Sequence, residues 1–326
     1  MTKASVYVTR MIPEDNIEEL RKHFAVEVNQ EDRALSKEEL KEKLKGKHAV
    51  ISLLTDTIDS EVLDAAGPQL KIVANYAVGF NNFDLAAATE RNVILTNTPG
   101  VLDESTATLT FTLLLSMARR IPEANKFLRD GKWQGWAPMF FIGLDVDKKT
   151  LGVAGLGRIG KNVARKAKGF DMKIIYTDVC RNEEFEKQVG ATFVDKETLL
   201  KESDFLTLHV PLIPETHHYI GEKELKMMKK TAVLINASRG PVVDEIALVK
   251  ALQEKEIWGA GLDVFEEEPR IAPGLSDLDN VVIVPHIASA TMDTRLKMGA
   301  IAVDNIIKVL KGQMPVTCVN PEVLKK

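Results

Sequence analysis

The chain has little cysteine, little net charge and no long hydrophobic run, and each shortage excludes a class of protein. Its two cysteines, Cys180 and Cys318, show neither a pairing pattern nor a metal-ligand spacing, which indicates a reducing compartment and no metal site. The net charge of −4 provides no basic surface for nucleic acid or an anionic membrane. The most apolar stretch, residues 109–118, is about half of the ~20 residues that a membrane-spanning helix needs.

The N-terminal segment also lacks the apolar core and the cleavage site of a secretory signal. We therefore expect a cytoplasmic protein that binds neither nucleic acid nor membrane.

What the sequence does contain is a regular alternation of short β-branched runs with amphipathic helical segments. Its 326 residues leave room for two domains. One alternating series starts near the N-terminus and a second near residue 150, so we predict an α/β protein with two doubly wound, mostly parallel sheets. Ser36, with Glu39 three residues later, has the spacing of a capping box. The aromatic segment 133–149 has the irregular pattern of a loop.

The segment GLGRIG fits the glycine pattern of a dinucleotide-binding turn at Gly155, Gly157 and Gly160. It follows an apolar strand and opens a helix expected over 161–168, which is the context that supports the pattern. The glycines permit a tight turn, close approach of the backbone to a pyrophosphate, and close packing of helix on strand. The N-terminus of the helix then offers N–H groups to the phosphates.

The next apolar run ends at Asp178, 18 residues after Gly160. An acidic side chain at this point accepts hydrogen bonds from the adenosine ribose and repels a 2′-phosphate, so we expect NAD rather than NADP. Arg181 keeps NADP open as the alternative, because a nearby arginine can accommodate the extra phosphate.

Three further side chains lie at or beyond the ends of apolar runs. Arg239 can bind a carboxylate through two parallel hydrogen bonds, although a surface ion pair explains it equally well in isolation. Glu268 ends a run of three glutamates, and such runs usually do no more than face solvent. His286 follows the apolar run VIVP, where the alternative to a functional role is a histidine that hydrogen-bonds to the backbone. A carboxylate beside an imidazole would fix its tautomer and favour its charged form.

Taken in order, GLGRIG, SRG, EEEP and PHIASAT resemble the D-isomer-specific 2-hydroxyacid dehydrogenases over essentially the whole chain. The segments NYAVGFNNFD, GKWQGWAP and GLDVFEEEP are similar to one branch, the glyoxylate/hydroxypyruvate reductases. The resemblance implies the catalytic set Arg239, Glu268 and His286, and places the substrate carboxylate on the Val78 and Gly79 backbone with Arg239. The family's dinucleotide contacts fall on Gly155, Leu156, Gly157, Arg158, Ile159, Gly160, Asp178, His209, Val210, Pro211, Ala237, Ser238 and Asp263.

The resemblance also implies a domain division that the periodicity does not reveal. A flavodoxin-like substrate domain would comprise residues 1–98 and 288–326, and a Rossmann-type NAD-binding domain would comprise residues 99–287. A homodimer is implied as well, in which Trp133 or Trp136 closes the partner's active site; a simple packed loop is the alternative. Thr108 stands where relatives often carry an acid, which bears on local hydrogen bonding more than on the chemistry. Ala288 stands where glycine is frequent, which leaves less room for the backbone to approach the cofactor.

The function implied is reduction of a small 2-keto acid, glyoxylate or hydroxypyruvate, to the D-2-hydroxy acid, with hydride from NADH and a proton from His286. One alternative is a phosphoglycerate dehydrogenase without a regulatory domain, since only 40 residues follow His286. A second is a NAD-sensing corepressor on the same fold, which would bind the dinucleotide and consume it very slowly.

Overall fold

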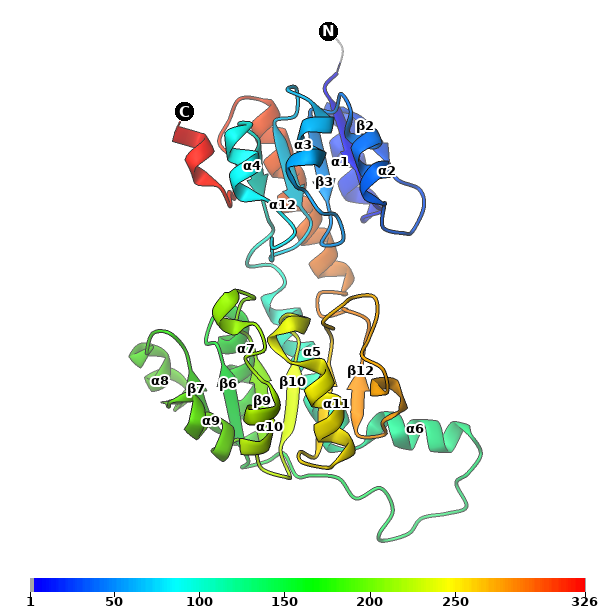
Figure 1. Cartoon of the computed structure of the whole chain (residues 1–326), viewed down its shortest axis with the longest axis vertical. Helices are drawn as coiled ribbons and strands as arrows, with labels where there is room; N and C mark the ends of the chain where they lie inside the picture. Colours follow the sequence, from blue (N-terminus) through cyan, green and yellow to red (C-terminus); the bar gives the residue numbers. More distant parts are fainter. Residues whose placement is uncertain (1–2, 326) are drawn as a thin grey trace. The chain divides into compact units, whose positions relative to one another are not determined.

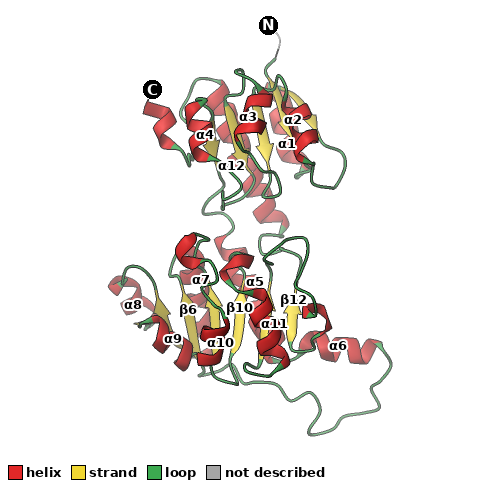
Figure 2. Cartoon of the chain, viewed as in Figure 1, coloured by secondary structure: helices red, strands yellow, loops and turns green. Residues whose placement is uncertain are grey.

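The computed structural model describes residues 3–325 and divides the chain into two compact units. The first unit holds the chain up to Leu102 together with the segment from Ala290 onward, and the second spans Asp103–Ser289. Each unit is a parallel sheet with helices on both faces (Figures 1 and 2). No helix among residues 3–325 has the length and apolar character needed to cross a bilayer.

The sheet of the first unit has five parallel strands in the order β2-β1-β3-β4-β5, which is the flavodoxin-like order. Its central strands β3 and β4 are buried at every position, as expected of parallel strands covered on both faces. The strands are β1 (Ser5–Val8), β2 (Ala25–Val28), β3 (Ala49–Ser52), β4 (Ile72–Asn75) and β5 (Ile94–Thr96).

Helices α2, α3 and α4 pack through buried aliphatic side chains on one face of this sheet, while α1 and α12 contact each other and α12 contacts β3 and β4. The capping box at Ser36 and Glu39 is confirmed at the start of α2. The helices are α1 (Glu14–His23), α2 (Lys37–Leu44), α3 (Ser60–Ala66), α4 (Leu85–Glu90) and α12 (Met292–Leu310), followed by the short 3-10 helix η5 (Pro321–Lys325).

The sheet of the second unit has seven parallel strands in the order β12-β11-β10-β9-β6-β7-β8. Read from its other edge, this is the Rossmann order extended by one strand, and the predicted fold class is confirmed. The strands are β6 (Thr150–Ala154), β7 (Lys173–Thr177), β8 (Thr192–Phe193), β9 (Phe205–Leu208), β10 (Val233–Asn236), β11 (Gly259–Leu262) and β12 (Val281–Ile283).

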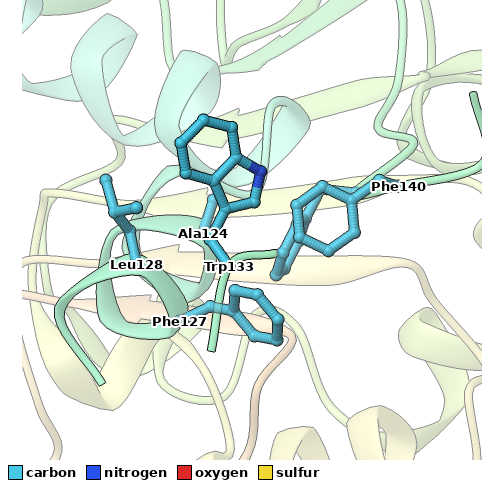
Figure 3. Close-up of a pocket in the computed structure, with 6 residues that line it drawn as sticks. Ala124, Phe127, Leu128, Trp133 and Phe140 are labelled. Atoms are coloured by element: carbon cyan, nitrogen blue, oxygen red, sulfur yellow. The ribbon is translucent and has the colours of Figure 1, made fainter. Parts of the chain in front are cut away.

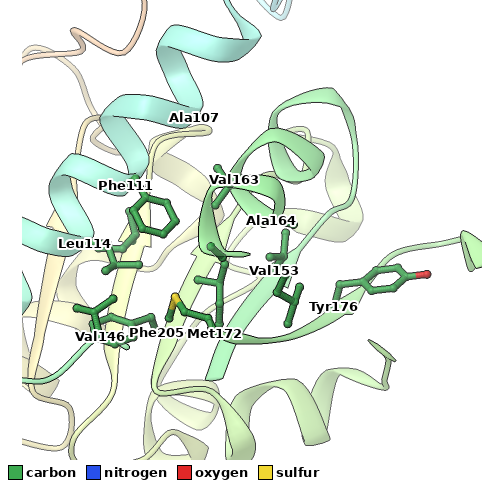
Figure 4. Close-up of a cluster of buried hydrophobic side chains, with 14 of the residues drawn as sticks. Ala107, Phe111, Leu114, Val146, Val153, Val163, Ala164, Met172, Tyr176 and Phe205 are labelled. Carbon is green, nitrogen blue, oxygen red and sulfur yellow. The ribbon is translucent and has the colours of Figure 1, made fainter. Parts of the chain in front are cut away.

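The helices of the second unit enclose two buried clusters, one on each face of the sheet. In the cluster of Figure 4, Phe111 and Leu114 from α5 and Val163 from α7 meet side chains of β6 and β9. Each such side chain contributes roughly 1.5–3 kcal/mol when it leaves water. The helices are α5 (Asp103–Ala118), α6 (Ile121–Arg129), α7 (Arg158–Ala167), α8 (Glu183–Val189), α9 (Lys196–Glu202), α10 (Glu222–Met227) and α11 (Glu245–Gln253).

One boundary in this unit differs from the prediction. Helix α7 begins at Arg158 rather than at residue 161, because the glycine motif itself forms its first turn with Gly157 as the N-cap. Strand β12 ends at Ile283, and the Val284 N–H beyond it still donates to the Leu262 carbonyl of β11. The aromatic segment between α6 and β6 contains no helix or strand, as predicted.

Candidate active site

Most of the residues expected to bind or react lie at the carboxyl ends of the strands in the second unit's sheet. All seven strands are parallel, so these ends lie on one side of the sheet, which is where open α/β sheets bind ligands. Six neighbouring strands each present a predicted residue there: Gly155 after β6, Asp178 after β7, His209 after β9, Arg239 beyond β10, Asp263 after β11 and His286 beyond β12.

The glycine turn between β6 and α7 has the geometry of a phosphate-binding turn. Gly155 has a φ of +89°, and a Cβ there would lie 2.8 Å from the carbonyl carbon of His209. At Gly160 a Cβ would lie 2.2 Å from the Gly155 carbonyl oxygen, so only glycine permits this turn. No side chain among residues 3–325 caps α7. Its first N–H groups are therefore available to an anion, and the turn fits the pyrophosphate of a dinucleotide.

Asp178 is held against this turn by two backbone groups. Its Oδ2 accepts a hydrogen bond from the Leu156 N–H at 2.6 Å, and its Oδ1 accepts one from the Val179 N–H at 2.7 Å. Each carboxylate oxygen can accept a second bond. The carboxylate is thus fixed beside the glycine turn with capacity left for ribose hydroxyls.

His209 lies behind the same turn as a neutral side chain. Burial lowers its pKa to about 3, and its Nε2 lies 2.7 Å from the Thr207 hydroxyl. Because its backbone is in contact with Gly155, the loop that begins at His209 and continues through Val210 and Pro211 borders the dinucleotide turn.

Arg239 is positioned by a turn that packs on the loop after β11. Asn236 Nδ2 donates to the Arg239 carbonyl at 2.9 Å, and Arg239 Nη1 donates to the Ser238 carbonyl at 2.7 Å. The next residue is Gly240, where a Cβ would lie 1.8 Å from the Phe265 carbonyl oxygen. Burial lowers the pKa of Arg239, and the nearby charge of Glu268 offsets this effect only in part. An arginine nevertheless remains cationic in proteins.

Glu268 and His286 are in direct contact. Glu268 Oε2 lies 2.9 Å from His286 Nδ1, and Glu268 Oε1 accepts a hydrogen bond from the Phe265 N–H at 3.1 Å. Burial raises the pKa of Glu268, but the hydrogen bond and charge of His286 outweigh it, so the pKa is lowered overall. An ionised Glu268 orients the imidazole with Nδ1 toward itself, which leaves Nε2 as the nitrogen for a reacting group.

Asp263 fixes the backbone immediately after His286. It is fully buried, and its two oxygens accept from the N–H groups of Ile287 at 2.6 Å and Ala288 at 3.0 Å. Burial raises its pKa, against the opposing effect of these N–H groups. His286 itself has a φ of +53°, in the left-handed region that few side chains adopt. The carboxylate clamp therefore holds the histidine in a turn that would otherwise be unfavourable.

In the first unit, three consecutive carbonyls of the loop after β4 accept hydrogen bonds. The carbonyls of Ala77, Val78 and Gly79 accept hydrogen bonds from the Thr98 N–H, Asn97 Nδ2 and Asn75 Nδ2, each at 2.8 Å. In a trans peptide the N–H points opposite to the carbonyl. The N–H groups of Val78, Gly79 and Phe80 therefore point away from these donors, an arrangement suited to an anion.

Three supporting side chains were not singled out from the sequence. Asn75 and Asn97 hold the loop just described, and both stand at or just beyond strand ends, which is the signal that could have identified them. Buried Glu245 accepts from the Ala272 N–H at 2.8 Å and from the Glu266 N–H at 3.3 Å, so it braces the loop that carries Glu268. Burial raises the pKa of Glu245.

This arrangement agrees with a family comparison. Residues 111–288 match the model of the D-isomer-specific 2-hydroxyacid dehydrogenase NAD-binding domain. A glyoxylate reductase of Korarchaeum cryptofilum is 51% identical over 326 residues, covering 99% of this chain and 98% of that protein. The chain belongs to the D-isomer-specific 2-hydroxyacid dehydrogenase family. It is therefore an oxidoreductase with an NAD-binding domain.

Solved structures of similar proteins share the fold. The TT0316 protein of Thermus thermophilus has a TM-score of 0.92 and 43% identity, with 97% of this chain and 99% of that chain covered. An NADPH-dependent glyoxylate/hydroxypyruvate reductase of Sinorhizobium meliloti, solved with NADP and malonate, has a TM-score of 0.87 and 32% identity, with 99% and 98% covered. One of these similar proteins therefore binds NADP.

Proposed function

We propose that this dehydrogenase reduces glyoxylate or hydroxypyruvate to the corresponding D-2-hydroxy acid with NADH, in the cytoplasm. The observation that carries the proposal is the 2.9 Å contact between Glu268 and His286, at the strand edge that also holds Arg239 and the glycine turn. The first unit would be the substrate domain, predicted as residues 1–98 and 288–326, and the second the NAD-binding domain, predicted as residues 99–287.

The catalytic roles follow from the chemistry of each side chain. When bound, NADH would supply a hydride for reduction of the keto carbon. His286 donates its Nε2 proton to the carbonyl oxygen, and Glu268 keeps the imidazole charged and aimed. Arg239 would bind the substrate carboxylate and stabilise the negative charge that develops on the reacting oxygen. The N–H groups of Val78 and Gly79 are the anion donors proposed for the first unit.

The dinucleotide would be held by the glycine turn and the neighbouring strand ends. The contacts proposed are the turn Gly155–Gly160, Asp178, the segment His209–Pro211, the pair Ala237 and Ser238, and Asp263. NAD is favoured over NADP because Arg181 is paired twice with Glu186, at 2.9 and 2.8 Å, and so is engaged elsewhere. The Asp178 charge would also repel a 2′-phosphate.

A homodimer is supported by an amphipathic segment that the second unit leaves uncovered. Helix α6 buries none of its residues, although Phe127 and Leu128 lie on it. They line a hollow with Trp133 and Phe140 from the following loop (Figure 3). Trp136, in the same loop, is 83% exposed. Apolar side chains gathered in this way are typical of an interface. In sedimentation equilibrium we expect the wild type to be a dimer and Leu128→Glu to be a monomer. If the variant is as dimeric as the wild type, this face is not the dimer interface.

The decisive experiment measures NADH and NADPH oxidation with glyoxylate, hydroxypyruvate, pyruvate and phosphohydroxypyruvate. We expect the highest kcat/KM with NADH and one of the first two acids. A clear preference for phosphohydroxypyruvate would favour the phosphoglycerate dehydrogenase instead. Tight NADH binding with very slow oxidation by every acid would favour the dinucleotide sensor and refute the proposal.

A further inference from the structure

Three side chains of the second unit that bind metals in other proteins lie together, outside the residues assigned above. They are His217, His218 and Glu266, here called the histidine–glutamate cluster. One ligand atom from each lies within 4.8 Å of the other two. The two histidines follow the short 3-10 helix η2 (Pro214–Thr216), and Glu266 lies 48 residues further along, so no local sequence spacing reveals the cluster.

The donor atoms are close to the geometry of a bound divalent cation. His218 Nε2 lies 2.6 Å from Glu266 Oε1, and the two imidazole centroids lie 4.1 Å apart at 31°. In a tetrahedral site with bonds near 2.1 Å, adjacent ligand atoms lie about 3.4 Å apart. The His218–Glu266 contact, at 2.6 Å, would therefore open by roughly 0.8 Å. Within residues 3–325 the ring nitrogens of His217 have no hydrogen-bond partner, and its exposed ring is free to turn toward the others.

The backbone around the cluster is already fixed. The His217 N–H donates to the Ile213 carbonyl at 3.0 Å, and the His218 N–H donates to the Pro241 carbonyl at 2.8 Å. Glu266 Oε2 accepts from the Glu245 N–H at 3.2 Å, which leaves Oε1 facing the imidazole. Fixed ligands lose less conformational freedom when a cation binds.

A second carboxylate lies on the opposite side of the His218 ring. Asp244 Oδ2 is 3.9 Å from His218 Nδ1. Histidines that bind a metal through one nitrogen commonly present the other N–H to a carboxylate, which fixes the tautomer. With Asp244 near Nδ1 and Glu266 near Nε2, the metal would take the place between Nε2 and Glu266.

We propose that the histidine–glutamate cluster binds one divalent cation of the class that prefers imidazole, such as Zn²⁺, Co²⁺ or Ni²⁺. His217, His218 and Glu266 are the protein ligands, and water completes the coordination. The cation would join the loop after β9 to the loop that carries Glu268. The proposal does not depend on the substrate or on the catalytic roles assigned above.

The test is titration of the full-length, chelator-treated protein with Co²⁺, followed by its visible absorption, and with Zn²⁺ by calorimetry. We expect a single site per chain, weakened at least about tenfold in His217→Ala and in Glu266→Gln. His23→Asn is the matched control, because His23 Nε2 lies 3.4 Å from Glu19 Oε1 without a second histidine. It should bind as the wild type does.

Since His217 is exposed, the metal-free His217→Ala variant should unfold at the same temperature as the metal-free wild type. If Glu266→Gln is unstable, the metal affinity of His217→Ala alone tests the proposal. Binding absent up to roughly 1 mM Co²⁺ would show that the cluster is only an ion pair. Binding that is unchanged in His217→Ala, or lost in His23→Asn, would equally overturn the proposal.

Discussion

Replacing Glu268 by glutamine tests the catalytic proposal most directly, because it removes one charge and keeps the shape. Reduction requires a protonated His286, so kcat/KM should fall as pH rises through the point where the imidazole loses its proton. The negative charge of Glu268, 2.9 Å from Nδ1, stabilises the protonated form. Without that charge, the half-maximal point of the reductive profile should move to lower pH.

The size of this shift follows from the exposure of the pair. Two unit charges about 4 Å apart interact by ~1 kcal/mol in water and by ~4 kcal/mol at the effective dielectric of a protein surface. The side chains of His286 and Glu268 are 32% and 37% exposed, so solvent screens their charges. Their interaction energy is therefore near the lower of these two figures, ~1 kcal/mol. An interaction of ~1 kcal/mol corresponds to a shift of the profile by about 0.7 pH unit.

The assay is the pH dependence of kcat/KM for glyoxylate reduction, measured for wild type, Glu268→Gln and Glu267→Gln. Glu267 lies in the same loop but pairs with Arg270 at 3.0 Å on the surface, so its profile should match the wild type. Raising the salt concentration should reduce the difference between wild type and Glu268→Gln. If the Glu268→Gln profile coincides with that of Glu267→Gln, the pairing has no catalytic role.

Three further changes test other parts of the site. His286→Gln should lower kcat at least about 100-fold with nearly unchanged NADH affinity; undiminished turnover would exclude proton donation by His286. Asn97→Leu leaves the Val78 carbonyl unpaired, so KM for glyoxylate should rise about tenfold while KM for NADH stays constant; equal changes in both would indicate a general loss of structure. Gly240→Ala places a Cβ 1.8 Å from a backbone oxygen, so chemical denaturation should show a loss above about 3 kcal/mol, and a wild-type midpoint would contradict the close packing.

The two parallel sheets could be predicted because they depend on local patterns. Short apolar runs separated by amphipathic segments are enough to indicate parallel sheets, and the carboxyl ends of such strands lie on one side of the sheet. The order of the strands depends on contacts between distant segments, which the local pattern does not contain. The start of α7 was missed by three residues because glycine has a low helix propensity, which the local motif overrides.

The contacts between distant residues could not be derived in the same way. Nothing in the run of three glutamates distinguishes Glu268, which reaches His286, from Glu266, which reaches His218, since the direction of each side chain depends on the turn. Only the family resemblance selected Glu268. The amides of Asn75 and Asn97 were overlooked for a related reason, because their hydrogen bonds go to the carbonyls of a neighbouring loop.

The buried carboxylate of Asp263 explains why a histidine can stand at the end of an apolar strand at all. An extended strand would carry the chain on past the sheet edge, whereas the left-handed φ of His286 turns it sharply. Such a turn is unfavourable for most side chains, and Asp263 compensates by binding the next two N–H groups. Asp263 is fully buried and both of its oxygens bind this turn, so its carboxylate holds His286 at the carboxyl end of the strand.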